Sequence, residues 1–165
     1  MFVMSVKGNT LKITAAILAA AIVITALVVF LPVGGAVSAG SVFEGKDTVN
    51  YDKIKTNENR IEFLRQFGWE PGDDCIEEAE IKIPADFDKI MKAYNEVQKA
   101  QGFNLDNYKG KTAMRYTYEI KNYPDYDGKV FANIIIYKNR VIGGDICSSD
   151  VDGFIHGFEK QASSE

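Results

Sequence analysis

The sequence has little basic charge, and this shortage limits the partners that the protein can bind. Only 19 of its 165 residues are Lys or Arg, against 23 Asp and Glu. Residues after position 41 hold all 23 acidic side chains but 17 of the basic ones, a net charge of −6. Nucleic-acid binding needs basic side chains that neutralise phosphates, and the sequence has no basic stripe with interleaved aromatics. We therefore expect no nucleic-acid partner.

Ionisable side chains are missing altogether between positions 13 and 43. Within this stretch, residues 13–31 form a continuous run of Ala, Ile, Val, Leu and Phe that is diluted by two threonines. As a helix, this run would be roughly 28 Å long at about 1.5 Å per residue. The hydrocarbon core of a bilayer is about 30 Å thick. We expect a transmembrane helix over residues 11–33, ended by Pro32 and the glycines that follow it.

The charges that flank this segment predict its orientation. Lys7 and Lys12 precede it, which is typical of a cytoplasmic N-terminus, here residues 1–10, and of an extracytoplasmic C-terminal domain. The alternative is a cleavable signal peptide, because Val37-Ser38-Ala39 has the small residues of a cleavage site. Cleavage near Ala39 would secrete the domain. Residues 34–56 are small and polar without periodicity, so we expect a flexible tether.

Residue patterns after position 56 predict one small α+β domain over residues 57–160 and a disordered tail over residues 161–165. Apolar residues at helical spacing indicate two helices, over residues 57–68 and 85–101. Period-two alternation or continuous apolar character indicates four strands, over residues 78–83, 113–121, 130–137 and 140–147. The order α-β-α-β-β-β favours a two-layer domain, with both helices covering one face of a mostly antiparallel four-stranded sheet.

Histidine and cysteine are scarce, with one and two copies, and this limits the catalytic sites that the chain can build. Asp145, Cys147 and His156 are the parts of a thiol nucleophile site. Packing explains His156 equally well, because it lies in a tail rich in glycine and aromatic residues. We assign no catalytic residue firmly. We also expect no metal and no cofactor, since residues 150–153 lack most ligands of a calcium loop.

The two cysteines also allow a disulfide, which an oxidising exterior would permit. Strand parity puts Cys75 on the same side as Ala79 and points Cys147 away from it, which disfavours the bond. A β-bulge at Gly143-Gly144 would reverse that parity. The sequence leaves both states of the cysteines open.

Several tyrosines are concentrated in the later strands and their connections. We expect most of them in the core or in cross-strand pairs. Tyrosine offers a large contact area at low entropic cost, so any that stay exposed would form a binding surface. The candidates for this surface are Tyr116, Tyr118, Tyr123 and Tyr126.

An ordered set of short motifs runs through the domain. The motifs are RIEFLRQFGWE from Arg60, YKGK from Tyr108, RYTY from Arg115, NYP from Asn122, VIGGDIC from Val141, DGF from Asp152 and HGF from His156. Together they resemble the bacterial family known as domain of unknown function 4830, over about residues 57–159. The resemblance implies a small exported or anchored bacterial domain. It implies no activity and supplies no functional residues.

These observations favour a single-pass protein of the cell membrane whose extracytoplasmic domain binds a protein or peptide partner. For each candidate catalytic group in the sequence, a role in packing is at least as good an explanation as a role in catalysis. The alternative is a small envelope hydrolase with a thiol site at Cys147, His156 and Asp145. That alternative requires the three side chains to converge in one pocket.

Overall fold

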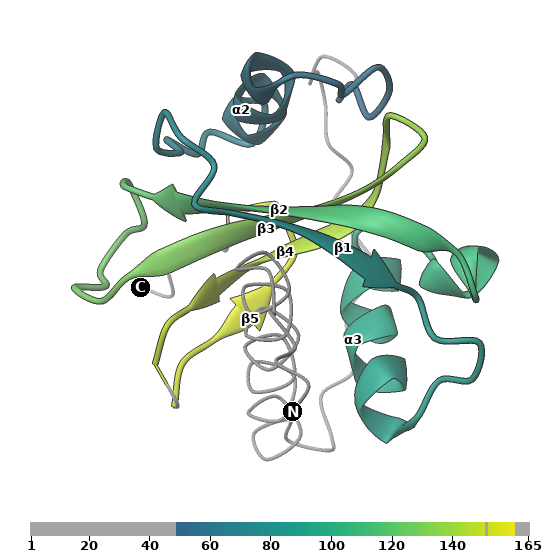
Figure 1. Ribbon diagram of the computed structural model, residues 1–165. Helices are drawn as coiled ribbons and strands as arrows, with labels where there is room; N and C mark the ends of the chain where they lie inside the picture. Colours follow the sequence, from purple (N-terminus) through teal and green to yellow (C-terminus); the bar gives the residue numbers. More distant parts are fainter. Residues whose placement is uncertain (1–48, 151, 161–165) are drawn as a thin grey trace, which may run out of the picture.

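The structure is a computed structural model, and it describes residues 49–150 and 152–160. Its elements follow the predicted order and add a short helix and a fifth strand (Figure 1). They are α2 (Asn57–Arg65), β1 (Glu77–Lys82), α3 (Lys89–Ala100), the 3-10 helix η1 (Leu105–Tyr108), β2 (Thr112–Ile120), β3 (Val130–Tyr137), β4 (Arg140–Ser148) and β5 (Ile155–His156). The five strands form one antiparallel sheet in sequence order. The predicted α+β class is confirmed.

The two helices lie on opposite faces of the sheet, with α2 above it and α3 below it in Figure 1. The predicted two-layer arrangement with both helices on one face is therefore wrong. The reason is visible in β3, whose side chains are apolar on both faces. Ile134 and Ile136 pack in the core between the sheet and α2, the α2-side core. Ile135 packs in the core between the sheet and α3, the α3-side core. A strand that is buried on both faces needs a cover on each side.

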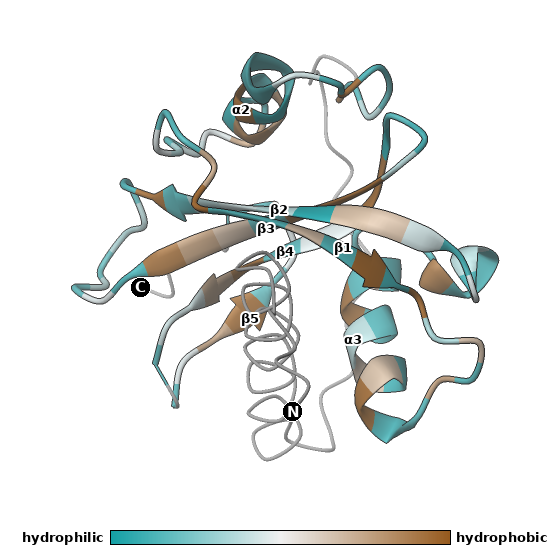
Figure 2. Cartoon of the chain, viewed as in Figure 1, coloured by the Kyte–Doolittle hydropathy of each residue, from teal (hydrophilic) through white to brown (hydrophobic). Residues whose placement is uncertain are grey.

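Each side of the sheet has its own hydrophobic core, and Figure 2 shows the hydrophobic colouring concentrated along β3 and where the helices face the sheet. The α2-side core contains fourteen buried residues, among them Phe63, Leu64, Trp69, Tyr118 and Phe158. The α3-side core is smaller and consists of Ile83, Phe87, Tyr94, Leu105, Ala113, Ile135 and Ile142. The larger core includes Ile61, Phe63 and Leu64, which attach the nine-residue helix α2 to the sheet.

Side-chain caps determine where the helices begin. Thr56 and Asn59 form a capping box at the start of α2. Asp88 caps α3, its carboxylate accepting a hydrogen bond from the Met91 amide at 2.7 Å. This cap explains why α3 begins at Lys89 rather than at the predicted residue 85.

A β-bulge in β4 determines which side chains face α3. Ile136 pairs with Val141 and Ile135 pairs with Gly143, so Ile142 is the extra residue. A bulge reverses the alternation of side chains beyond it. Asp145, which pairs with Asn133, is consequently turned toward the α3 side.

The ordered domain begins earlier than predicted. Ile54 is buried in the α2-side core, and its amide donates to the Asn139 carbonyl at 2.9 Å. The Tyr51 carbonyl accepts from the Val141 amide at 2.9 Å. Residues 49–56 therefore pack on the sheet and are not part of the expected tether. Two isolated apolar side chains in a polar stretch have no periodicity that could predict this packing.

No helix in the described ranges is long and apolar enough to cross a membrane. The predicted transmembrane segment at residues 11–33, the first part of the tether, the cleavage site near Ala39 and the tail at residues 161–165 lie outside those ranges.

Candidate functional site

A buried polar network links α3 to the sheet through Asp145. This carboxyl group is only 3% exposed. One oxygen accepts from the Tyr94 hydroxyl at 2.7 Å, and the other accepts from the Asn133 amide at 2.9 Å. Asn133 in turn accepts from the Thr117 hydroxyl at 2.7 Å. Burial raises the pKa of Asp145 and, together with the adjacent carboxyl, raises the pKa of Tyr94 well above its usual value.

Cys147 lies beside this network, and its environment suppresses thiol reactivity. The side chain is 4% exposed, and the Asn133 amide lies 3.5 Å from its sulfur. Burial and the nearby Asp145 carboxyl raise the pKa of the Cys147 thiol far above that of a free cysteine. The thiolate is the nucleophilic form, so this cysteine is held in its inert form.

His156 lies on the other face of the sheet. Ile155 pairs with Cys147, whereas His156 pairs with Ile146, whose side chain is in the α2-side core. The imidazole Nδ1 is 2.7 Å from the Gly157 carbonyl, so it donates there. Nε2 then accepts from the Tyr123 hydroxyl at 3.1 Å. Burial lowers the pKa of His156, which favours this neutral form.

The structure thus brings Asp145 and Cys147 together but separates both from His156. Both imidazole nitrogens are engaged on the α2 side, so the imidazole does not face the Cys147 sulfur, whose neighbours are the Asp145 carboxyl and the Asn133 amide. A thiol site needs nucleophile and base within hydrogen-bond reach. The convergence that the hydrolase alternative requires is not present.

The two cysteines are free thiols on different faces of the sheet. Cys75 packs against the α2-side core, and its sulfur lies 3.0 Å from the Glu77 carbonyl. Cys147 lies on the α3 side, beside Asn133. The β4 bulge therefore does not bring them together, and the disulfide alternative is not formed in this structure.

The four candidate tyrosines do not make one surface. Tyr118 is 0% exposed and belongs to the core, where its hydroxyl accepts from Arg60 and donates to Asn57, both at 2.7 Å. Tyr116 lies beneath the Arg60 guanidinium, 3.8 Å from ring centre to carbon. The other two, Tyr123 and Tyr126, lie in a separate aromatic cluster.

This aromatic cluster is built around Tyr123. Its ring stacks on Trp69 with centroids 5.6 Å apart and on Phe154 with centroids 4.5 Å apart. Tyr126 packs edge-on against Phe154, and its hydroxyl donates to the Asp150 carboxylate. The cluster holds the chain that leads into β5 against the start of the β2–β3 connection. Trp69 is buried, and the other three rings are half-buried, so the cluster has a structural role and offers only a small area for contact with a partner.

A groove of about 550 Å³ lies between the C-terminal end of α3 and β5. Sequence reasoning did not identify it, because its walls come from four separate segments of the chain. Its half-buried apolar residues are Tyr51, Phe67, Val97, Phe103 and Ile155. Phe103 packs edge-on against Tyr51, 5.4 Å between centroids, and so fixes one wall. The only sequence signal for it is the aromatic residue beside the glycine at each helix end.

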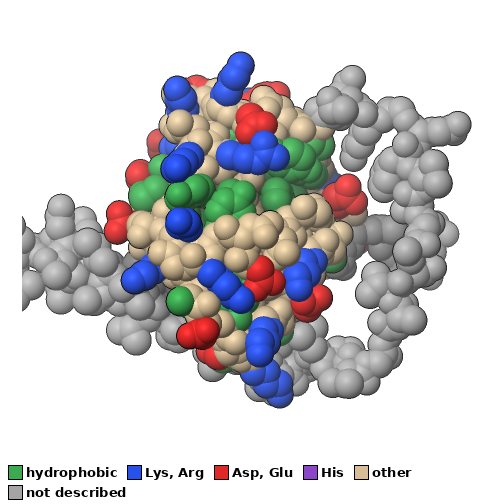
Figure 3. Space-filling view, turned by 90° about the vertical axis from the view of Figure 1, so that its right-hand side faces the viewer, with side chains coloured by type: hydrophobic (Ala, Val, Ile, Leu, Met, Phe, Trp, Pro, Cys, Tyr) green, Lys and Arg blue, Asp and Glu red, His purple; other side chains and the backbone are tan. Residues whose placement is uncertain are grey.

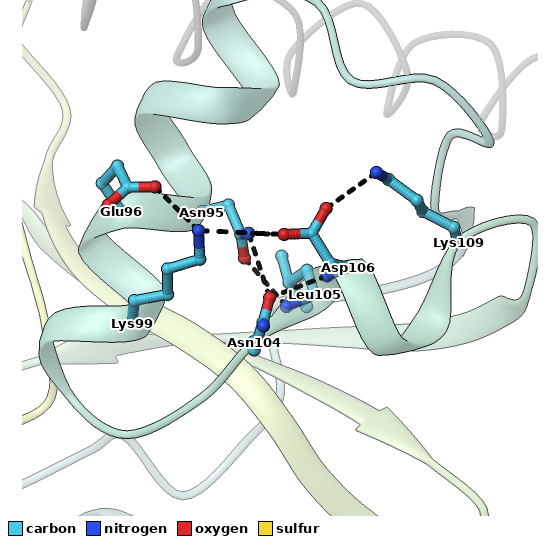
Figure 4. Close-up of polar contacts among 7 residues, drawn as sticks. All are labelled: Asn95, Glu96, Lys99, Asn104, Leu105, Asp106 and Lys109. Atoms are coloured by element: carbon cyan, nitrogen blue, oxygen red, sulfur yellow. Dashed lines mark hydrogen bonds and ion pairs between the residues drawn. The ribbon is translucent and has the colours of Figure 1, made fainter.

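A second hollow of about 490 Å³ lies between α3 and η1, and most of the residues that line it have charged or amide side chains. Figure 4 shows the polar contacts beside it. Asn95, 2% exposed, donates to Asn104 at 3.1 Å and to Asp106 at 3.0 Å, and accepts from the Leu105 amide at 2.8 Å. The Asp106 carboxylate also pairs with Lys109 at 2.8 Å, which lowers the pKa of Asp106. These groups satisfy one another and hold the turn. Their arrangement explains the turn without any ligand.

Metal ligands do not cluster in the described ranges, where no group of three or more His, Cys, Asp or Glu side chains could hold an ion. The fold and the site geometry define a small antiparallel α+β domain, with a helix on each face and, at one end, a groove lined by both aromatic and polar side chains. The three candidate catalytic side chains, Asp145, Cys147 and His156, are buried and make structural contacts.

The chain belongs to the family described as Domain of unknown function (DUF4830), whose model matches residues 63–146. The resemblance seen in the sequence is confirmed, over a shorter span than expected. The match runs from within α2 to the end region of β4 and leaves out β5. No curated protein and no solved structure matches the chain significantly.

Proposed function

We propose that the protein is held in the cell membrane by residues 11–33 and binds a protein or peptide partner through its extracytoplasmic domain. The apolar segment and the lysines before it support the anchor and its orientation. The groove between α3 and β5, with its aromatic residues and its polar rim, supports the binding of a partner. A preformed groove that combines aromatic and polar side chains is suited to binding a peptide segment.

The groove is the observation that carries the binding function. Phe67 and Phe103 are held by contacts with Phe158, which is buried, so the groove walls are preorganised. Partners bind most strongly where aromatic residues line a pocket, because little side-chain entropy is lost there. Glu159 and Lys160 line the same groove and supply polar contacts of both signs. The fitting ligand is a peptide segment that presents an apolar side chain.

The side of the domain on the right in Figure 1 is also suited to contacts with a protein. Figure 3 views this side and shows a band of hydrophobic side chains, surrounded by basic and acidic ones. A surface that is mixed in this way, rather than uniformly charged, supports interaction with a protein.

Site-specific photocrosslinking in intact cells tests the binding function. A photoreactive residue at Val97 should yield a crosslinked partner of defined mass. The same residue at Ile76, which is 54% exposed and outside the groove, should not yield it. Phe103→Ala should weaken the Val97 crosslink at least about fivefold, as the loss of an aromatic anchor does.

Tyr126→Ala is the matched control, because it truncates a half-buried aromatic residue outside the groove. It should leave the Val97 crosslink unchanged. Identical products from Val97 and Ile76, or no product at Val97, would refute binding through the groove.

Membrane fractionation tests the anchor separately. The full chain should stay in the membrane pellet after an alkaline carbonate wash, and external protease should digest the domain. Recovery of a shortened chain in the medium would instead indicate cleavage near Ala39.

A further inference from the structure

The sheet has an open edge at β1 that is long enough to pair with another strand. Among the described residues, β1 is hydrogen-bonded to β2 alone, at one end of the strand order. It contains neither proline nor glycine. The opposite edge, β5, has only two residues. Proteins protect exposed edges by shortening them, by interrupting them with proline or a bulge, or by placing charged side chains on them. Of these devices, β1 has only the charges, and the pattern of those charges decides which strand it can pair with.

The backbone register shows which groups of β1 point outward. The Ile83 amide donates to the Lys111 carbonyl at 2.9 Å, so odd-numbered residues of this segment hydrogen-bond to β2. In an antiparallel ladder the alternate residues direct their amides and carbonyls to the other side. Glu78, Glu80 and Lys82 therefore present these groups at the open edge. Their side chains are exposed as well.

The charges along this edge match a second copy of the same strand in one register. Centred on Ile81, an antiparallel copy puts Glu80 opposite the partner's Lys82 and Lys82 opposite the partner's Glu80. Neither Glu80 nor Lys82 forms an ion pair with another described residue. Opposite charges on directly paired residues stabilise a ladder. Ile81 then packs against its own copy.

Neighbouring registers place like charges together. Centring on Ala79 puts Glu78 against the partner's Glu80. Centring on Glu80 pairs Glu78 with the partner's Lys82 but puts Glu80 against itself, and centring on Lys82 puts Lys82 against itself. Like charges that are directly opposite destabilise a sheet. Glu77 is held away by its ion pair with Arg115 at 2.9 Å.

We propose that two copies of this chain pair antiparallel through β1, centred on Ile81, so that their sheets join into one. Residues 79–83 of each copy would form the ladder, with about four backbone hydrogen bonds. This pairing uses a different surface from the groove. It rests on the proposed anchor only because a shared membrane raises the effective concentration of two copies.

Cysteine crosslinking of the full chain in membranes tests the register. At a pair centred on Ile81, the two Cα atoms would be about 4.5 Å apart. A disulfide spans Cα separations of about 4.4 to 6.8 Å. In a Cys75→Ser background, Ile81→Cys should therefore form a disulfide-linked dimer on mild oxidation. Ala79→Cys is the matched control, because its two copies would be displaced by about 13 Å along the strands.

The expected result is a dimer yield at least about fivefold higher for Ile81→Cys than for Ala79→Cys, since only the former meets the disulfide geometry. Equal yields, a higher yield from Ala79→Cys, or no dimer from either would overturn the proposal. Unchanged Trp69 fluorescence verifies that each variant is folded, because this single tryptophan is buried in the α2-side core.

A charge swap tests the recognition itself. In the Ile81→Cys protein, Glu80→Lys or Lys82→Glu should each lower the dimer yield several-fold, and the double variant should restore it. Single variants without effect, or a double variant without rescue, would overturn the charge-matched pairing. Phe103→Ala should not alter dimer yield, and Glu80→Lys should not alter the Val97 crosslink. The two proposals therefore fail separately.

Discussion

The Tyr94 hydroxyl donates a 2.7 Å hydrogen bond to Asp145 across the interface between α3 and β4. Both side chains are buried, so the bond also compensates for removing a carboxyl group from water. Other links between α3 and the sheet are also polar, including the Gln98 oxygen that accepts from the Gly144 amide at 2.8 Å. The α3 layer is thus held by side-chain hydrogen bonds as well as by its small apolar core.

Tyr94→Phe should lower the free energy of unfolding by about 1 to 3 kcal/mol, because it leaves one oxygen of a buried carboxyl without its donor. Urea unfolding followed by Trp69 fluorescence measures the change. Tyr137→Phe is the control, since Tyr137 is a half-buried tyrosine on the same side of the sheet. An effect of Tyr94→Phe no larger than that of the control would contradict this role.

Asp145 should make stability depend on pH in the opposite direction to most carboxyl groups. Its pKa is raised in the folded state, so the folded protein binds the proton more tightly than the unfolded chain. Stability should therefore rise as the pH falls through the folded pKa and level off below the unfolded pKa of about 3.9. Asp145→Asn should remove this rise. The measurement is the difference in urea stability between wild type and variant from pH 7 to pH 4, and a constant difference would contradict it.

Cys147 should resist alkylation in the folded protein. Its thiol is buried and its pKa is raised, so the reactive thiolate is scarce at pH 8. Peptide mass spectrometry after iodoacetamide treatment should find Cys147 modified only once urea unfolds the domain. Rapid labelling of native Cys147 would contradict the inert environment and reopen the thiol-site interpretation.

Gly144 should be intolerant of any side chain. Its φ is +156°, and an added Cβ would overlap the Asn133 carbonyl oxygen and the Phe158 ring. Because the Asn133 carbonyl is part of the β3 backbone beside β4 and Phe158 is buried, neither can move away easily, and Gly144→Ala should cost about 3 kcal/mol or more of unfolding free energy. Gly110→Ala is the matched control, since Gly110 has φ +73° but nothing within 4 Å, and it should cost about 1 kcal/mol. Similar costs for the two variants would refute the steric argument.

Local patterns in the sequence predicted the strands well. Val130–Tyr137 was predicted with its observed bounds, because a continuous apolar run between turn residues has few other interpretations. The face of the sheet that each helix covers was not predictable, since the apolar stripe of an amphipathic helix does not specify which face of a sheet it meets. β5 was missed because two residues carry no periodicity.

The candidate site was predictable only in part. Asp145 and Cys147 were identified as neighbours on one face, which strand alternation allows. The partner of Asp145, Tyr94, is 51 positions away and on another element, and no local pattern encodes that contact. His156 was grouped with them by residue type, whereas its pairing with Ile146 puts it on the opposite face.

His156 should titrate below the usual histidine range, because burial penalises its charged form. It is the only histidine in the chain, so its imidazole NMR signals can be followed without assignment. The midpoint should lie below about 6.5, the value of an exposed histidine. A lowered folded pKa means that the unfolded chain binds the proton more readily. Stability from this group is therefore fully present above about pH 6.5, and it is lost as the pH falls from there through the lower folded pKa.

His156→Gln should remove that loss, so wild type and variant should converge or cross in stability between pH 7 and pH 5. Urea unfolding followed by Trp69 fluorescence measures the difference, and Tyr123→Phe provides a second variant that removes the donor to Nε2. The hydrogen bond from the Tyr123 hydroxyl stabilises the neutral imidazole. Its loss should therefore move the titration midpoint of His156 upward. A midpoint at or above 6.5 in the wild-type protein would show that the ring is solvated, and it would remove the basis for its neutral, engaged state on the α2 side.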